Sequence, residues 1–222
     1  FSIAAFRHHR HLRRGIIPGP SVPTPDRVRR PGGVILAGAG AGVGRRIAKN
    51  GRITQDGKQG GLALRLTGGE IVVRTLLQAG VPFVSGIPGH GCLALVDAFR
   101  RQQSEMPVYV VRHEQSAVHI ADGYYRVAGR PAAVFTSIGP GALNTAVGLG
   151  TCFVDSTAVL GLIGETHTHM VGRGVLQELE RVRAADSIRV LEPVAKYAQA
   201  VTRVEQLPHA LGRALRAMTT GR

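Results

Sequence analysis

The sequence PVYVVRHEQSAVHIADGYYRVAGRPAAVFTSIGPG, residues 107–141, places a helical pattern between two short apolar segments. We expect the apolar segments, 107–111 and 132–136, to be strands and the segment between them, 114–128, to be a helix. A glycine-rich loop, 137–141, follows the second strand. Short strands that are almost wholly apolar are typical of a parallel sheet with helices on both faces.

The same alternation of helices and strands extends in both directions from this stretch. Thr67 is a predicted helix N-cap with Glu70 at the capping-box position, and Gly80 ends that helix. The predicted fold class is α/β, with three α/β/α layers around a mostly parallel sheet. Further strands are predicted at 82–85, 158–163 and near 197–201, and further helices at 92–103, from the 137–141 loop to about Phe153, and at 204–218.

The composition fits a globular α/β protein. With 222 residues, 44% of them hydrophobic, the chain is long enough for one large domain, or for one domain and an extension. The frequent Gly (30 residues) suits the tight turns of an α/β protein. No apolar run approaches the roughly 20 residues of a membrane helix, so no membrane partner is expected. Cys92 and Cys152 lie far apart in the sequence, which favours a reduced, cytoplasmic setting.

The net charge of +14 is concentrated near the N-terminus. Residues 1–60 contain 12 Lys and Arg but 2 Asp and Glu, whereas residues 61–222 contain 16 basic and 12 acidic residues. We expect residues 61–222 to be the domain and residues 1–60 to be an irregular basic extension. We expect this extension to be a disordered tail, a targeting peptide, or else upstream DNA translated in error or a fragment boundary. Nucleic-acid binding would rest on residues 1–60 alone and would weaken steeply with salt. No nucleic-acid partner is predicted.

The glycine-rich segment PGGVILAGAGAGVG, residues 31–44, does not match a dinucleotide-binding loop. The pattern G-x-G-x-x-G starting at Gly38 requires a glycine where Val43 stands. We interpret the segment as a flexible linker.

Glu114 is the one carboxylate in three loops predicted to follow the carboxyl ends of strands, where open parallel sheets bind ligands. These loops are residues 86–91, 112–115 and 137–144. A zinc site of the H-E-x-x-H kind is not expected, because His113 and His119 are six positions apart. No metal ligands are predicted. The alternative to a functional role for Glu114 is a helix-start carboxylate that the helix macrodipole stabilises.

Several motifs occur in a characteristic order and spacing between about Leu66 and Arg222. They are Gly86-Ile-Pro-Gly89, His113-Glu-Gln115, Ala121-Asp-Gly-Tyr-Tyr-Arg126, Gly139-Pro-Gly141 with Asn144, Asp155-Ser156, Gly172-Arg-Gly-Val-Leu-Gln-Glu178 and Thr219-Thr-Gly-Arg222. Together they resemble the pyrimidine-binding domain of thiamine-diphosphate enzymes. The resemblance is specifically to the acetolactate synthase-like group of 2-oxo acid decarboxylases and carboligases.

The resemblance implies the pyrimidine-binding fold and a role for each matching residue. Glu114 would hydrogen-bond the N1′ nitrogen of the aminopyrimidine ring and move a proton there, which activates the cofactor for attack on a 2-oxo acid. Gln177 matches a glutamine near the reaction centre of acetolactate synthases and would contact the substrate, and His90, which does not match the family, is a second candidate for this contact. The other implied cofactor-binding residues are Pro88, Gly89, Gly139, Pro140, Gly141 and Asn144.

Two positions depart from the family pattern and concern the substrate. Leu176 stands where the group usually has Phe, and His90 stands where it commonly has Gly. The identity of the 2-oxo acid is therefore left open. His90 could donate a proton or orient a carboxylate, and a loop-capping histidine is the alternative.

The resemblance also implies partners beyond this sequence. Family members bind the diphosphate through Mg²⁺ on a Gly-Asp-Gly…Asn motif of a second domain, and no Gly-Asp-Gly occurs here. Acetolactate synthases also bind FAD in a middle domain, which no motif here supports. The family's active site forms between subunits, so a homodimer or tetramer is expected and the chain alone is predicted to be inactive. The alternatives are the pyrimidine-binding subunit of a split decarboxylase, or an inactive fragment.

Overall fold

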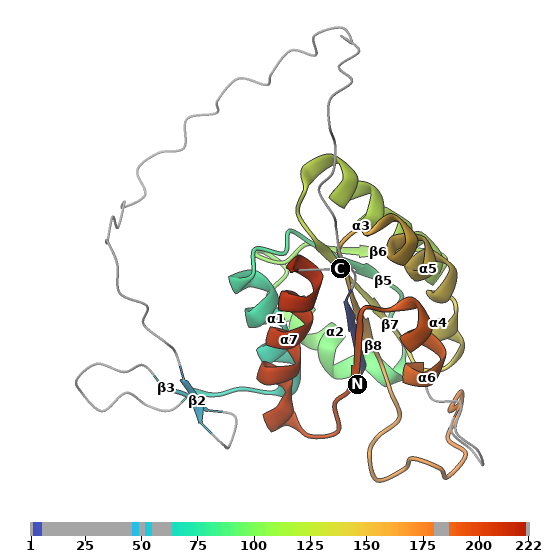
Figure 1. Cartoon of the computed structure of the whole chain (residues 1–222). Helices are drawn as coiled ribbons and strands as arrows, with labels where there is room; N and C mark the ends of the chain where they lie inside the picture. Colours follow the sequence, from blue (N-terminus) through green and yellow to red (C-terminus); the bar gives the residue numbers. More distant parts are fainter. Residues whose placement is uncertain (1, 6–45, 49–51, 55–63, 180–186, 221–222) are drawn as a thin grey trace, which may run out of the picture.

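The computed structural model describes residues 2–5, 46–48, 52–54, 64–179 and 187–220. Most of these residues form one six-stranded sheet with helices on both faces (Figure 1). The predicted α/β class, with helices alternating with apolar strands in three layers, is confirmed.

Four neighbouring strands of the sheet run parallel to one another. In order across the sheet they are β6 (Val108–Val110), β5 (Val84–Gly86), β7 (Ala132–Thr136) and β8 (Val159–Ile163). Successive side chains of a strand point to opposite faces. In β7, Ala133 and Phe135 therefore pack into one core, whereas Ala132 and Val134 pack into the other. A strand buried on both faces explains the unbroken apolar runs in the sequence.

One face of the sheet is covered by α1 (Gly68–Gln78), α2 (Leu93–Arg101) and α7 (Leu207–Thr219). Buried residues of these helices join the strand residues of that face in the larger of two apolar cores. The rings of Phe99 on α2 and Phe135 on β7 lie 5.4 Å apart between centroids. This helix layer lies toward the left of Figure 1.

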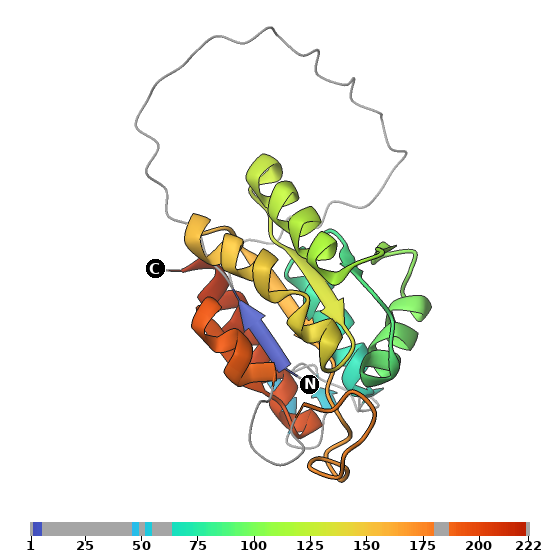
Figure 2. The same ribbon diagram turned by 90° about the vertical axis from the view of Figure 1, so that its right-hand side faces the viewer.

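The opposite face is covered by α3 (Glu114–Ala128), α5 (Ala146–Asp155) and α6 (Ser187–Leu191), and the single turn α4 (Pro140–Leu143) precedes α5. Figure 2 turns this side toward the viewer. Helix α3 ends at Gly129, whose φ of 65° is the left-handed conformation that glycine adopts readily. Among the described residues, no helix combines the length and hydropathy needed to span a membrane.

Three of the predicted helices are divided in the structure, and the one predicted at 204–218 is a 3₁₀ turn followed by α7. The helix predicted at 92–103 is a 3₁₀ turn, η1 (His90–Cys92), followed by the shorter α2. The single helix predicted after the 137–141 loop is divided into α4 and α5, with Asn144 and Thr145 between them. The remaining short helices are η2 (Glu192–Val194) and η3 (Val204–Gln206).

Strand β1 (Ser2–Ala5) belongs to the main sheet, although we assigned residues 1–60 to an irregular extension. It lies between β8 and β9 (Tyr197–Ala200) and pairs antiparallel with both. Ile3 is fully buried in the core beneath α7. Four residues are too few to show a strand period, so the two neighbouring strands, and not local propensity, decide this pairing.

A second, three-stranded antiparallel sheet consists of β2 (Arg46–Ala48), β3 (Arg52–Thr54) and β4 (Leu64–Arg65). It was also not predicted from the sequence. The glycine-rich segment 31–44, interpreted as a linker, lies outside the described residues. The division of the chain near residue 60 stays a prediction.

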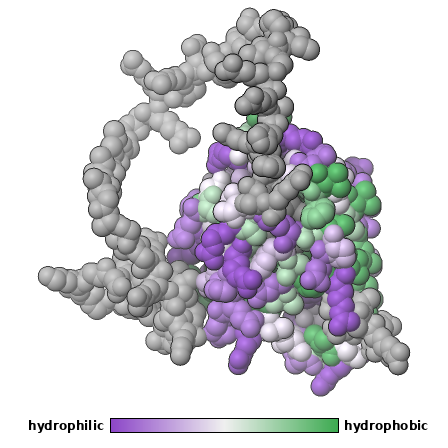
Figure 3. Space-filling view, viewed as in Figure 1, coloured by the Kyte–Doolittle hydropathy of each residue, from purple (hydrophilic) through white to green (hydrophobic). Residues whose placement is uncertain are grey.

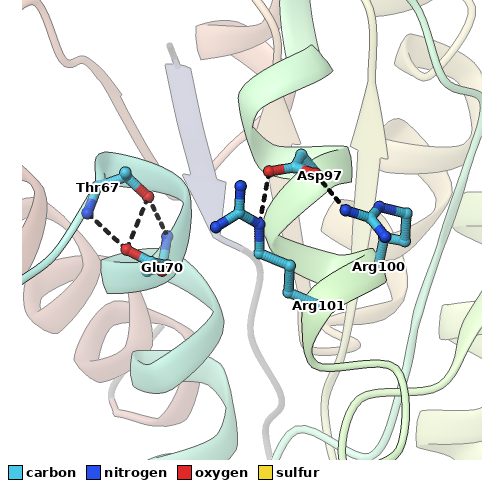
Figure 4. A network of polar contacts seen from close by, with 5 residues as sticks. All are labelled: Thr67, Glu70, Asp97, Arg100 and Arg101. Carbon is cyan, nitrogen blue, oxygen red and sulfur yellow. Dashed lines mark hydrogen bonds and ion pairs between the residues drawn. The ribbon is translucent and has the colours of Figure 1, made fainter.

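The start of α1 follows the capping-box prediction (Figure 4). Thr67 Oγ1 accepts a hydrogen bond from the backbone N–H of Glu70 (3.3 Å), and Glu70 Oε2 accepts one from the backbone N–H of Thr67 (2.8 Å). The hydrogen bond from the Thr67 backbone holds the pKa of Glu70 below its usual value. On α2, Asp97 forms ion pairs with Arg100 (3.1 Å) and Arg101 (2.8 Å).

Arg126 connects α3 to α5. Its Nη2 lies 2.5 Å from Oδ2 of Asp155, and its Nε lies 3.0 Å from Oδ1 of Asp122. The hydrogen bonds to Asp155 and Asp122 raise the pKa of Arg126 above its ordinary value. Two of the motifs that carried the family resemblance therefore meet in an ion-pair network that fixes the helix layer.

Candidate functional site

Loops follow the carboxyl ends of β5 and β7 at the same edge of the sheet, and glycines let these loops approach each other closely. A Cβ on Gly89 would lie 2.4 Å from the side chain of Ser137, and a Cβ on Gly91 would lie 2.5 Å from Ile138. The backbone N–H of Gly91 also donates to Ser137 Oγ (3.4 Å). Because parallel strands end at one edge, segments 48 residues apart in sequence form one surface.

Glu114 is the first residue of α3, directly after β6. His113 is the N-cap, and its ring nitrogen Nδ1 accepts a hydrogen bond from the backbone N–H of Gln115 (3.3 Å). The Glu114 side chain is buried, with 8% of the residue exposed. The positive end of the α3 dipole favours a negative charge at this position. His119 contacts Gln115 (3.1 Å between Nε2 atoms) and not Glu114, so the two histidines do not form a shared ligand set with it.

The carboxylate of Glu114 faces the loop that follows β7. Asn144 Nδ2 donates to Glu114 Oε2 at 2.9 Å. A Cβ on Gly141 would lie 3.1 Å from Glu114 Oε1, so the absence of a side chain there leaves space beside this oxygen. Oε1 has no hydrogen-bond donor among the described residues. A buried carboxylate with one oxygen fixed and the other free to bind a ligand is suited to a ring nitrogen.

Gly139 shapes the turn that brings Gly141 and Asn144 to Glu114. Its φ is 59° and its ψ is −114°, a combination available to glycine but costly for other residues. Pro140 then occupies the first turn of α4, where its missing N–H leaves no hydrogen bond unmade. A Cβ on Gly139 would also lie 2.0 Å from the backbone oxygen of Gln177.

The structure brings the predicted site residues together to different degrees. Asn144 donates a hydrogen bond to Glu114, and Gly141 lies beside the Glu114 carboxylate. Gly89 reaches this group through Ser137, and Gly139 lies against Gln177. Pro88 and Pro140 are exposed at the same edge, without a described contact to Glu114.

His90 lines a cavity of about 570 Å³ beside this group of loops. The cavity lies between the N-terminal ends of α1 and α2 and the segments that follow β8 and β9. Its charged and titratable lining residues are His90, Cys92, Glu165, His167 and Arg203. His90 Nε2 lies 3.2 Å from the backbone oxygen of Leu176, which places the side chain within reach of the loop that carries Gln177.

Glu178 was not singled out from the sequence, although it closes one of the quoted motifs. Its carboxylate accepts hydrogen bonds from the backbone N–H groups of Gly172 (2.6 Å), Gly174 (2.8 Å) and Val175 (3.0 Å). The sequence feature that could have indicated Glu178 is the pair of glycines that stand four and six positions before this acidic residue. Ser137, which contacts both Gly89 and Gly141, was also missed.

The thiols and the other histidines do not extend this site. Burial raises the pKa of Cys152 to about 11 and also raises the pKa of Cys92, so neither thiol is an activated nucleophile. The rings of His167 and His169 stack 5.8 Å apart. In the described part of the chain, no group of three His, Cys, Asp or Glu residues could hold a metal ion.

Comparison with known proteins connects this geometry to a family. Residues 66–184 match the family described as "Thiamine pyrophosphate enzyme, N-terminal TPP binding domain". The acetolactate synthase large subunit of Haemophilus influenzae is 35% identical over 158 residues, which cover 71% of this chain and 26% of that protein. The acetolactate synthase isozyme 3 large subunit of Escherichia coli is 36% identical over 157 residues, with the same coverage.

A third relative is the mitochondrial acetolactate synthase catalytic subunit of Aspergillus candidus, 33% identical over 156 residues, or 70% of this chain and 22% of that protein. The chain thus spans about a quarter of the length of the curated relatives it matches. The match covers β5 to β8 and every loop that contacts Glu114. The chain therefore belongs to the thiamine pyrophosphate enzymes and contains their N-terminal TPP binding domain, of the acetolactate synthase-like kind.

Proposed function

We propose that this chain supplies the pyrimidine-binding half of the active site of a thiamine-diphosphate-dependent decarboxylase or carboligase that acts on a 2-oxo acid. The observation that carries this proposal is the buried carboxylate of Glu114, with Oε2 fixed by Asn144 and Oε1 beside Gly141, which has no side chain to crowd it. Thiamine diphosphate, when bound, supplies the carbon nucleophile for the 2-oxo acid.

Glu114 would hold a proton between its carboxylate and the ring nitrogen N1′. Asn144 fixes the rotation of the carboxylate, so that Oε1 is the oxygen available for this proton. The missing side chain at Gly141 keeps Oε1 uncrowded, because a Cβ at that position would lie 3.1 Å from it. A proton transfer of this kind contributes roughly 10²–10⁴-fold to the rate of an enzyme.

The cavity beside His90 is the proposed place for the 2-oxo acid. Arg203 provides hydrogen-bond donors that suit a carboxylate, whereas Val72 and Leu207 provide apolar surface for a short aliphatic chain; His90 borders the same cavity. Gln177 is proposed to contact the substrate from the neighbouring loop. Which 2-oxo acid binds is left to experiment.

The complete active site is proposed to need parts beyond this domain. In this proposal, a second domain binds Mg²⁺ and the diphosphate. The subunits form a homodimer or tetramer with the active site at their interface, and the protein acts in the cytoplasm. The domain alone is predicted to be inactive. A split enzyme, with this chain as the pyrimidine-binding subunit, is the second arrangement compatible with the same role of Glu114.

An exposed apolar surface supports the proposed oligomer. Large hydrophobic side chains are exposed along α3 and α5, and Figure 3 shows hydrophobic residues gathered at the right, where Figure 1 places these helices. Exposed apolar patches of this kind mark interaction surfaces. The exposed residues are Ile120, Val127, Val147, Phe153 and Val154.

The proposed activity is tested by an assay of the protein from the complete reading frame. Release of CO₂ from pyruvate and longer 2-oxo acids is measured with and without thiamine diphosphate and Mg²⁺. We expect release from at least one 2-oxo acid that depends on both additions. Cofactor binding without release from any 2-oxo acid would contradict the substrate class, and no cofactor binding would contradict the site.

Asn144→Leu is expected to lower the turnover of the same protein by roughly tenfold. The substitution keeps the side-chain volume but removes the donor to Glu114 Oε2, so the carboxylate is free to rotate. Because the buried Glu114 Oε2 loses its donor, the free energy of unfolding should also fall by about 1–3 kcal/mol, so kcat is compared well below both melting temperatures. The measurement is kcat beside thermal unfolding, with exposed Gln103→Leu as the matched control. An Asn144→Leu protein with wild-type kcat would show that Asn144 does not orient Glu114.

A further inference from the structure

We propose that Glu178 is a positioning residue for this site. Its carboxylate folds the loop of residues 172–178 so that the loop backbone holds His90 on one side and the turn at Gly139 on the other. This inference rests on the proposed function only because that function gives His90 and Glu114 their roles in the site. The contacts that carry it are independent of any ligand.

The first step is the way the carboxylate closes the loop. Glu178 is 7% exposed, and its two oxygens accept the backbone N–H groups of Gly172, Gly174 and Val175. The backbone N–H of Glu178 in turn donates to the Val175 oxygen at 3.0 Å. Hydrogen bonds to an ionised carboxylate are about twice as strong as those between neutral groups. Gly172 and Gly174 have φ of 78° and 73°, which lets their N–H groups converge on one carboxylate.

The second step is the contact of this loop with His90. The backbone oxygen of Leu176 lies 3.2 Å from His90 Nε2, and a carbonyl oxygen can only accept. Nε2 of His90 therefore carries the hydrogen, and in the neutral ring the lone pair is at Nδ1. The exposed Leu176 side chain does not hold this segment in place. The position of its backbone oxygen therefore depends on the loop that Glu178 closes. The loop thereby selects one tautomer of a histidine that lines the cavity.

The third step is the contact with the turn behind Glu114. Gln177 has a φ of 64°, a left-handed conformation that is unfavourable for a residue other than glycine. In this conformation its backbone oxygen lies against Gly139, where a Cβ would be 2.0 Å away. Gly141, two residues further along, borders Glu114 Oε1. A continuous line of contacts thus runs from Glu178 through Gln177 and Gly139 to the catalytic carboxylate.

Glu178→Gln tests this inference because it keeps the size of the side chain but replaces one accepting oxygen with a donor group. In the full chain labelled with ¹⁵N, we expect the wild-type His90 ring to show the Nε2–H tautomer. The variant is expected to lose this fixed tautomer and to shift the amide signals of Gly139 and Gly141. His209, which is exposed on α7, serves as the internal control and should keep its signals.

A purely local role for Glu178 gives a different result. The amides of Gly172 and Gly174 would then shift while the His90 tautomer and the amides of Gly139 and Gly141 stay unchanged, and this outcome overturns the proposal. Should Glu178→Gln fail to fold, Gly174→Ala strains the same loop at a φ of 73° without touching the carboxylate. It is expected to give the same changes at His90 and Gly139, and their absence would overturn the proposal equally.

The NMR result and the activity of the enzyme can fail separately. Suppose that Glu178→Gln changes the His90 tautomer but that substitution of Glu114 leaves the turnover of the complete enzyme unaffected. The positioning role of Glu178 would then stand, and the proposed chemistry of Glu114 would be wrong. An unchanged tautomer together with a large loss of turnover on Glu114 substitution would do the reverse.

Discussion

Glu114→Gln in the complete enzyme is expected to lower kcat by about 100-fold or more, in line with the contribution of a positioned proton-transfer group. Glutamine has nearly the same shape as glutamate but cannot take up or release the proton at N1′. The loss should therefore appear in kcat, and any rise in KM should be smaller.

The same substitution is expected to leave the fold almost unchanged. The amide oxygen of a glutamine at position 114 can still accept the hydrogen bond from Asn144, and the helix start at His113 is not altered. A change in the free energy of unfolding below about 1 kcal/mol is expected, because no buried group loses its partner. Thermal unfolding of both proteins checks this point.

Two further variants complete the experiment on Glu114. Glu105→Gln removes an exposed carboxylate in a turn and should have wild-type kinetics. Glu114→Asp keeps the carboxyl group but shortens the side chain by one methylene. Because a misplacement of about 1 Å can lower a rate by roughly 10²-fold, this variant should also lose most of its kcat. A Glu114→Gln protein with kcat within about twofold of wild type would falsify the assignment of Glu114 as the catalytic carboxylate.

Ile3→Ala is expected to lower the free energy of unfolding by about 2–5 kcal/mol, the usual cost of truncating a fully buried isoleucine to alanine. Ile3 has no exposed surface and stands opposite Leu162 of β8 and Gln199 of β9. Among the described strands, β9 is hydrogen-bonded to the sheet through β1. Weakening β1 should therefore also loosen β9 and the helix that follows it.

Urea unfolding followed by circular dichroism measures this effect. Ile3→Val, which removes one methyl group, should cost about 0.5–1.5 kcal/mol. Leu211 lies on α7 in the same core, and Leu211→Ala should lower the free energy of unfolding by as much as Ile3→Ala. Val127→Ala removes methyl groups from a side chain that is 92% exposed and should change stability by less than about 0.5 kcal/mol. If Ile3→Ala behaves like Val127→Ala while Leu211→Ala destabilises, β1 is not part of the sheet in solution.

Elements with a strong local signal could be predicted from the sequence. The capping box at Thr67 and Glu70, the apolar run of β7 and the glycine after α3 each involve residues a few positions apart. Their physical basis is backbone hydrogen bonding and side-chain period, which a short window of sequence contains. The α/β alternation followed directly from these local signals.

Features made by distant segments could not be predicted in this way. Strand β1 is four residues long and has no period of its own, and its antiparallel position depends on the edges that β8 and β9 present. The role of Glu178 depends equally on a folded loop, because its three donors converge only when Gly172 and Gly174 adopt left-handed conformations.

For this protein, the sequence by itself determined the α/β alternation, the start of a helix at Glu114 and the glycines that leave room beside it, because these depend on neighbouring residues. Only the tertiary structure decided that Asn144, thirty residues later, donates to the Glu114 carboxylate, and that the Glu178 loop reaches His90. Parallel strands bring their carboxyl ends to one edge whatever their separation in the chain. The contacts made there depend on the packing of the whole sheet, and no local pattern contains that information.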